Sequence, residues 1–228
     1  LVARQWRAGR VFVAGDAAHM QPPFLGQGMC QGLRDVANLA WKLVAVQRGE
    51  VQGAAAEALL DSYGHERQAH VRALTTRLKA VGAVICERDL ERARARDARL
   101  LAECGGRVPD TPRQDVLPRL EAGLLARADA PGRGMLFPQA RLADGALMDQ
   151  RFGTGWRLVS DGTLSLPPGV SGLTIIHLGP AGTPEAEGVV AAWLQRHVCH
   201  AAIVRPDHYV YGTADNPGAL AALLAERR

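Results

Sequence analysis

Apolar positions in the first third of the chain recur at helical spacing after one short apolar run. Residues 10–15 (Arg-Val-Phe-Val-Ala-Gly) are mostly apolar and end at glycine, which predicts a buried strand. In residues 29–47 and 55–85, apolar side chains recur three or four positions apart, which predicts two long helices. The apolar stripe of the first helix, a kind of face that globular proteins bury, comprises Leu33, Val36, Ala37, Ala40, Leu43 and Val44.

The sequence pattern changes in the middle of the chain. The apolar helical periodicity ends, a highly charged stretch follows, and a stretch rich in helix-breaking residues comes after it. Residues 87–103 interleave arginine with acidic residues, which favours a solvated helix over a stripe that binds nucleic acid. Residues 106–134 are rich in proline and glycine, which break regular structure. We therefore predict a connection at 106–134 between a first domain, residues 1–105, and a second domain, residues 135–228.

The second predicted domain alternates short apolar runs with two helical stretches. The order strand, strand, helix, strand, strand, helix is that of a small α/β layer fold and looks like thioredoxin. The cysteine pair of that fold is missing, so the resemblance implies a structural domain and no redox role. Asp207 and His208 are expected to form the turn between the last two strands. We predict strands at 156–160, 173–178, 201–204 and 209–211, and helices at 185–197 and 218–227.

The first predicted domain poses a structural problem. Residues 1–105 offer one convincing strand and several long helices, yet the backbone N–H and C=O groups of a buried strand need partners. Either the strand at 10–15 pairs with strands that this chain lacks, or the segment is a helical bundle.

Composition narrows the classes of protein. The 228 residues are 47% hydrophobic and 22% charged, as in ordinary globular proteins of one or two domains. The net charge is +4 but the arginines are dispersed, so we expect no nucleic-acid partner. No apolar run reaches the roughly 18 residues of a bilayer span and no signal peptide is evident, so we expect a cytoplasmic protein without a membrane partner. The four cysteines form no C-x-x-C pair, and we expect no metal site.

The loop that follows residues 10–15 carries the candidate chemistry. Asp16 comes directly after the predicted strand, and glycines at 26 and 28 lead into the first long helix. A carboxylate can accept hydrogen bonds from hydroxyl groups, while free amides and the dipole at a helix N-terminus favour an anion. The alternative is that Asp16 caps a turn and the glycines only permit tight bends. These physical arguments alone leave both interpretations open.

A resemblance favours the first interpretation. Residues 15–28 (GDAAHMQPPFLGQG) and 35–42 (DVANLAWK) resemble the second FAD motif of the flavoprotein aromatic hydroxylases, the p-hydroxybenzoate hydroxylase-like family. Within this group, residues 26–35 (GQGMCQGLRD), 62–71 (SYGHERQAHV) and 204–207 (VRPD) look most like the 3-(3-hydroxyphenyl)propionate hydroxylases. A thioredoxin-like tail also occurs in the phenol hydroxylases of this group. The resemblance therefore implies an α/β fold: the C-terminal part of a Rossmann-like FAD-binding domain with long helices, followed by a thioredoxin-like α/β domain.

The resemblance assigns cofactor roles within the loop. It implies that Asp16 hydrogen-bonds the ribityl chain of FAD, that Pro22 and Pro23 flank the isoalloxazine ring, and that His19 packs structurally. It assigns no catalytic side chain. The cofactor-binding residues that it implies are Gly15, which lets the backbone approach, Asp16, Pro23, the loop-shaping Gly26 and Gly28, and Met29 and Cys30, whose amides face the N1 and O2 edge of the flavin.

The implied activity is that of an FAD-dependent monooxygenase. It uses NADH or NADPH as reductant and O2 to hydroxylate a small phenolic aromatic acid, such as 3-(3-hydroxyphenyl)propionate, in aromatic catabolism; homodimerisation is left open. The family's G-x-G-x-x-G fingerprint is absent and the first residue is Leu1, so we expect a C-terminal portion that is inactive alone. The alternatives are a non-catalytic thioredoxin-like interaction or dimerisation module with a relic FAD motif, and an FAD-linked dehydrogenase that does not hydroxylate.

Overall fold

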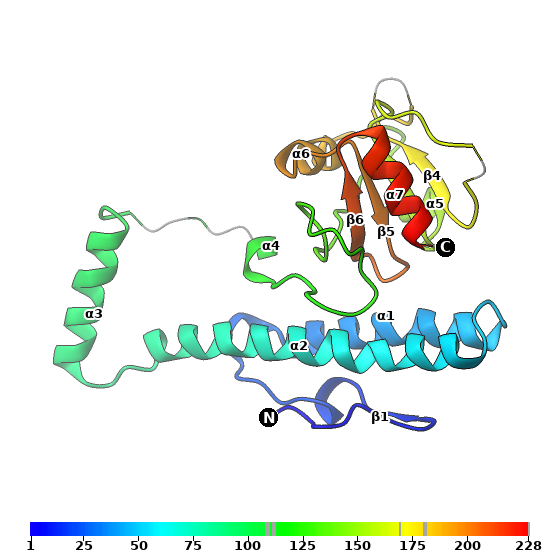
Figure 1. Ribbon diagram of the computed structural model, residues 1–228. Coiled ribbons are helices and arrows are strands. Elements are labelled where there is room, and N and C mark those ends of the chain that lie inside the picture. Colours follow the sequence, from blue (N-terminus) through cyan, green and yellow to red (C-terminus); the bar gives the residue numbers. More distant parts are fainter. Residues whose placement is uncertain (108–109, 111–112, 169, 180–181, 228) are drawn as a thin grey trace.

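The structure is a computed structural model that describes residues 1–107, 110, 113–168, 170–179 and 182–227. A helical part, residues 1–103, lies beside a sheet part that runs from Leu117 to Arg227 (Figure 1). A short helix, α4 (Arg113–Val116), lies between the two parts. Helix and sheet thus occur together as expected for an α/β protein. Within the described residues, no helix combines the length and apolarity needed to cross a membrane.

The expected buried strand at residues 10–15 is wrong in its extent and its burial. Only Val11–Phe12 (β2) is a strand, and it pairs antiparallel with Arg7–Ala8 (β1) immediately before it. The Val11 side chain is 67% exposed. The backbone of this segment thus finds its strand partner within the same hairpin. It has a further contact with the long helix α2 (Gly53–Ile85), because the Tyr63 hydroxyl donates to the Val13 carbonyl over 2.8 Å. The alternative of a purely helical bundle is therefore wrong for this segment.

Three helices follow, as predicted. Helices α1 (Gly28–Gln47) and α2 (Gly53–Ile85) form an antiparallel hairpin and lie side by side (Figure 1). Helix α3 (Leu90–Glu103) extends away from them and buries none of its residues. Its exposed Arg94 and Glu91 form an ion pair of 3.1 Å, which agrees with the predicted solvated helix.

Helix α1 buries its polar face. All six residues of the predicted apolar stripe are exposed; Leu33, for example, is 62% exposed. The expectation that this stripe faces the core is therefore wrong within this chain. Polar residues on the opposite face find charged and amide partners on α2 and the sheet part, so their burial is compensated. The buried residues of α1 are Gln31, Asp35, Asn38, Lys42 and Ala45.

The sheet part contains four strands, β3 (Arg157–Ser160), β4 (Thr174–His177), β5 (Ala201–Val204) and β6 (Val210–Ala214), in the order β4-β3-β5-β6. Strands β3 and β4 are parallel, and the other two neighbouring pairs are antiparallel. The four predicted strands are confirmed, with boundaries shifted by up to three residues.

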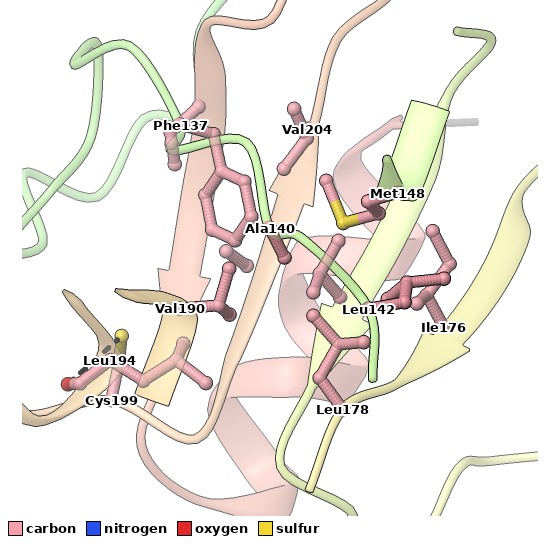
Figure 2. Close-up of a cluster of buried hydrophobic side chains, with 13 residues drawn as sticks. Phe137, Ala140, Leu142, Met148, Ile176, Leu178, Val190, Leu194, Cys199 and Val204 are labelled. Atoms are coloured by element: carbon pink, nitrogen blue, oxygen red, sulfur yellow. Dashed lines mark hydrogen bonds between the residues drawn. The ribbon is translucent and has the colours of Figure 1, made fainter. Parts of the chain in front are cut away.

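Helices cover both faces of this sheet. Helix α6 (Val189–Arg196) packs Val190 and Leu194 against one face, together with Met148 of the short helix α5 (Met148–Phe152) (Figure 2). Helix α7 (Pro217–Arg227) packs its leucines against the opposite face. Because successive strand residues point to opposite faces, neighbours such as Leu158 and Val159 enter different cores.

The first predicted helix of this part begins later than expected. We expected it from residue 185, but Gly188 adopts a left-handed conformation (φ 65°) and α6 starts at Val189. Glu185 instead accepts hydrogen bonds from the amides of Val190 and Ala191 at 3.0 and 2.8 Å, and so satisfies free N–H groups at the helix N-terminus.

The turn between β5 and β6 reaches the helical part. Asp207 and His208 lie in this turn as predicted, and the amide of Arg205 donates to the carbonyl of Tyr209 over 2.8 Å. Arg205 and Asp207 then meet side chains of α1 and α2 in a set that we call the buried charge cluster. It consists of Asn38, Lys42, Glu66, Arg205 and Asp207, each at most 3% exposed.

Glu66 is the centre of the buried charge cluster. Its Oε2 accepts from Asn38, Lys42 and Arg205 over 2.6–2.9 Å. Its Oε1 accepts from the Leu124 amide at 2.7 Å and from Arg205 at 3.1 Å. Burial alone would raise the pKa of the Glu66 carboxyl, but the charges of Arg205 and Lys42 outweigh it and lower the pKa to about 2. Burial lowers the pKa of Lys42 to about 8, partly opposed by the charge of Glu66.

We predict that truncation of a leucine lowers the free energy of unfolding much more at a buried position of α2 than on the exposed apolar stripe of α1. Leu74→Ala removes a fully buried side chain of α2 and should lower the free energy of unfolding by about 2–5 kcal/mol. Leu33→Ala, on the exposed stripe of α1, should change it by about 0.5 kcal/mol or less. Urea unfolding of both variants measures the difference, and equal losses would contradict the reversed burial of α1.

We also predict a specific acid sensitivity. The pKa of Glu66 is about 2 in the folded protein against 4.5 in its ordinary state, so its contribution to stability is complete above pH 4.5 and is lost as the pH falls toward 2. Glu66→Gln should therefore reduce the slope of unfolding free energy against pH in this window by up to about 1.4 kcal/mol per pH unit. Glu57→Gln, which alters an exposed carboxylate, is the control. Identical slopes for Glu66→Gln and the wild type would contradict the prediction.

Candidate functional site

The loop of residues 15–30 lies against the start of helix α1. Gly15 opens a short 3₁₀ turn, Gly15–Ala17, with a left-handed φ of 58°. A Cβ atom on Gly32 of α1 would lie 3.4 Å from the Gly15 Cα atom. The absence of side chains at both positions therefore allows the loop backbone to pack directly on the helix.

Asp35 holds the loop in this position. This fully buried carboxylate of α1 accepts from the Gly15 amide at 3.0 Å and from Arg67 Nε of α2 at 2.8 Å, and its Oδ2 lies 2.7 Å from His19 Nε2. Burial acts to raise the pKa of Asp35, but the hydrogen bond from His19 and the charge of Arg67 override it and lower the pKa. Asp35 thus remains an acceptor that ties loop, α1 and α2 together.

His19 has a structural role here, as expected. Its ring is 3% exposed, contacts Asp35 and stacks on Trp6 with centroids 5.7 Å apart. A side chain so enclosed cannot meet a substrate in this arrangement.

Arg67 extends the same network in two directions. It donates to Gln31 Oε1, in the second turn of α1, over 2.8 Å. Its other terminal nitrogen lies 3.4 Å from the hydroxyl of Tyr209, at the end of the β5–β6 turn. All three side chains are buried.

Asp16, by contrast, faces solvent. Its carboxylate is exposed and makes no hydrogen bond or ion pair with the described part of the chain. The alternative that Asp16 caps a turn finds no supporting hydrogen bond among these residues. The carboxylate is free to accept from hydroxyl groups of a ligand.

The N-terminus of α1 is also open. Gln27 is the residue before the helix, and no side chain caps the helix there. The amides of Gly28, Met29 and Cys30 are in the first turn and have no intrahelical acceptor. A Cβ on Gly28 would meet nothing within 4 Å, so the space beside this glycine is open. Such a terminus favours a negatively charged group.

The segment between these two features packs on α2. Pro23 is exposed and precedes a second 3₁₀ turn, Phe24–Gly26. The Phe24 ring lies over Gly82 of α2, where any Cβ would clash with it. The prolines and Gly26 are thereby held near the helix hairpin.

The loop therefore fits a ligand that carries both hydroxyls and a delocalised negative charge. Asp16 offers an acceptor for hydroxyls, and the open helix terminus offers amides and a favourable dipole for an anion. The flavin end of FAD has both features. Within the described residues, no group of His, Cys, Asp and Glu side chains is arranged to hold a metal ion.

Sequence reasoning missed the residues that position this loop. The resemblance included Asp35, Asn38 and Lys42 as motif letters but gave them no roles. Their signal was the spacing of polar residues at 31, 35, 38 and 42, which marks one face of a helix.

A separate pocket of about 490 Å³ lies in the sheet part, between the chain near Phe137 and helix α6. Trp193 and His197 line it. None of the residues expected to bind a cofactor contributes to this pocket.

Comparisons with known proteins place the chain among FAD-dependent hydroxylases. Residues 1–78 match the family described as FAD binding domain. The probable NADH-specific resorcinol 4-hydroxylase of Rhodococcus jostii (strain RHA1) is 39% identical over an alignment of 246 positions. The alignment covers 99% of this chain and 44% of that protein. The 3-(3-hydroxy-phenyl)propionate/3-hydroxycinnamic acid hydroxylase of Mycobacterium sp. (strain JLS) is 39% identical over 173 residues, 69% of this chain and 29% of the relative.

A solved structure extends the similarity to the fold. Aklavinone-11 hydroxylase in a ternary complex with FAD and aklavinone matches with a TM-score of 0.65 and 26% identity, over 98% of this chain and 45% of that chain. The chain thus spans less than half the length of these relatives.

We predict that Asp35→Asn destabilises the protein strongly. It removes the charge opposite the buried Arg67 guanidinium, and breaking a buried ion pair costs about 3–5 kcal/mol. Asp61→Asn breaks the more exposed pair with Arg7 and should cost about 1 kcal/mol or less. Urea unfolding compares the two, and equal losses would exclude Asp35 as the anchor of the loop.

Proposed function

The chain belongs with the FAD-dependent aromatic hydroxylases that its motifs predicted, and on that premise we propose that its loop binds the flavin end of FAD. The proposed cofactor-binding residues are Gly15, Asp16, Pro23, Gly26, Gly28, Met29 and Cys30. The observation that carries the proposal is the pairing of an exposed, unpartnered carboxylate with an uncapped helix N-terminus on one anchored loop.

Each part of the loop has a separate task. Asp16 accepts hydrogen bonds from the ribityl hydroxyls, and the amides of Met29 and Cys30 stabilise negative charge on the N1 and O2 edge of the ring. Pro23 flanks the ring. When bound, FAD would supply the redox chemistry: two electrons from NADH or NADPH and one O2 would give one oxygen atom to the substrate and one molecule of water.

The proposed substrate is a small phenolic aromatic compound. Two relatives support this class, since their names specify resorcinol and 3-(3-hydroxyphenyl)propionate or 3-hydroxycinnamic acid. The NADH specificity in the first name favours NADH as reductant. A phenol ring is electron-rich, which suits transfer of an electrophilic oxygen atom.

We further infer that the site needs a second segment. The sequence carries no G-x-G-x-x-G, the usual seat of the FAD pyrophosphate, and the apolar stripe of α1 is exposed. A dinucleotide-binding segment that covers this stripe would supply both missing features. Without it, we expect no catalysis.

We infer that residues 135–228 form a thioredoxin-like domain and that residues 106–134 connect it to the first domain, residues 1–105. Its strand order β4-β3-β5-β6, with one parallel and two antiparallel pairs, supports this assignment. No helix joins β3 to β4 among the described residues, where thioredoxin has its first core helix.

An FAD titration tests the proposed site. We predict saturable quenching of flavin fluorescence by the chain alone, or by the chain with a G-x-G-x-x-G flavoprotein segment supplied separately. Asp16→Ala should raise the dissociation constant about tenfold, because it removes charge-assisted hydrogen bonds worth about 1.5–3 kcal/mol.

Asp97→Ala is the matched control, since it removes another exposed carboxylate far along the chain on helix α3. Its affinity for FAD should equal that of the wild type. Equal affinity of Asp16→Ala and the wild type would disprove the role of Asp16. Absence of binding with and without the added segment would disprove the proposed function and would favour a non-catalytic module.

A further inference from the structure

We propose that the β5–β6 turn (Arg205–Tyr209) positions the flavin-binding loop, so that the sheet part sets the geometry of a cofactor site to which it contributes no ligand. The inference rests on the proposed function of that loop. Two chains of buried contacts carry it.

The first chain runs from Tyr209 to the loop backbone. The Tyr209 hydroxyl lies 3.4 Å from a terminal nitrogen of Arg67, and Arg67 Nε donates to Asp35 over 2.8 Å. Asp35 in turn accepts from the Gly15 amide at 3.0 Å. The chain therefore ends at the residue directly before Asp16.

A branch of the same chain reaches helix α1. Arg67 donates to Gln31 over 2.8 Å, and Gln31 follows Cys30, whose amide is proposed to face the flavin. Arg67 thus contacts Gln31 at the helix terminus that carries the anion-binding amides, and it reaches the segment that carries Asp16 through Asp35.

The second chain runs through the buried charge cluster. Asn38 lies one turn after Asp35 on α1 and donates to both Glu66 and Asp207, over 2.6 and 2.8 Å. Arg205 binds Asp207 and Glu66 together, with five contacts of 2.6–3.1 Å to side chains and to the Leu124 carbonyl. These contacts fix the rotation of α1 about its axis and its position along that axis.

Water cannot replace a lost hydrogen-bond partner of the side chains in these two chains of contacts. Arg67, Asp35, Gln31, Asn38 and Arg205 are completely buried, so loss of one partner leaves a polar group that must move to find another. Loss of the Tyr209 hydroxyl acts directly on Arg67, whose other partners are Asp35 and Gln31. A change in the turn is therefore transmitted toward Gly15 and Gln31.

The test compares two tyrosines that differ in this connection. Tyr209→Phe keeps the ring and removes the hydroxyl beside Arg67. Tyr211→Phe removes a hydroxyl from β6, where the ring packs on Trp156 and makes no hydrogen bond with the described residues. Amide hydrogen exchange is measured on the full chain without ligand, and FAD affinity is measured as above.

We expect Tyr209→Phe to increase exchange about tenfold in residues 14–20 and 28–32, and to leave exchange in the β3–β5 core unchanged. FAD affinity should fall about tenfold where the wild type binds. Tyr211→Phe should change neither. Arg205→Lys, which keeps the charge but loses the fork of donors, should increase exchange in the same residues and serves as the second variant.

Two results would overturn the inference. One is unchanged exchange in residues 14–20 for both Tyr209→Phe and Arg205→Lys. The other is an increase spread evenly over the chain, which signifies a merely structural role. A local increase in a chain that fails to bind FAD would support positioning of the loop while disproving the proposed function, so the two failures are distinguishable.

Discussion

The buried carboxylate of Asp35 is the constraint on which the arrangement of the helical part depends. It bonds the Gly15 amide and the His19 ring of the loop and the Arg67 guanidinium of α2, and the two side chains are buried with it. A buried carboxylate without such partners would be prohibitively costly, so the partners must stay together. The position of Gly15, and hence the exposure of Asp16, follows from this requirement.

The same constraint explains why α1 buries the face that hydrophobicity alone would expose. Asp35 shares its helix face with Gln31, Asn38 and Lys42, and each of these finds a partner on α2 or on the β5–β6 turn. Turning the apolar stripe inward would separate these four polar side chains from their hydrogen-bond partners. The apolar stripe therefore stays on the exposed face of α1. The polar face of the same helix is buried and is held by hydrogen bonds.

Sequence patterns predicted much of this fold and little of its anchoring. Periodicity located α1, α2 and the four strands, because spacing reports secondary structure directly. It misjudged which face of α1 is buried, since a stripe such as Leu33 to Val44 indicates an apolar face but not what covers it. The buried strand at 10–15 was wrong because its partner, Arg7–Ala8, has no apolar signal. The loop from Gly15 to Cys30 was found through resemblance, whereas Arg67 and Tyr209 lie 32 and 174 residues from Asp35, beyond any local pattern.

Flavin binding by the loop at the start of α1 can be followed through the backbone amide NMR signals of the labelled chain during addition of FAD, with a G-x-G-x-x-G segment present if needed. Binding at this loop predicts the largest shifts at Gly15, Asp16, Met29 and Cys30. Shifts centred instead on the pocket of Trp193 and His197, or no shifts under either condition, would contradict it.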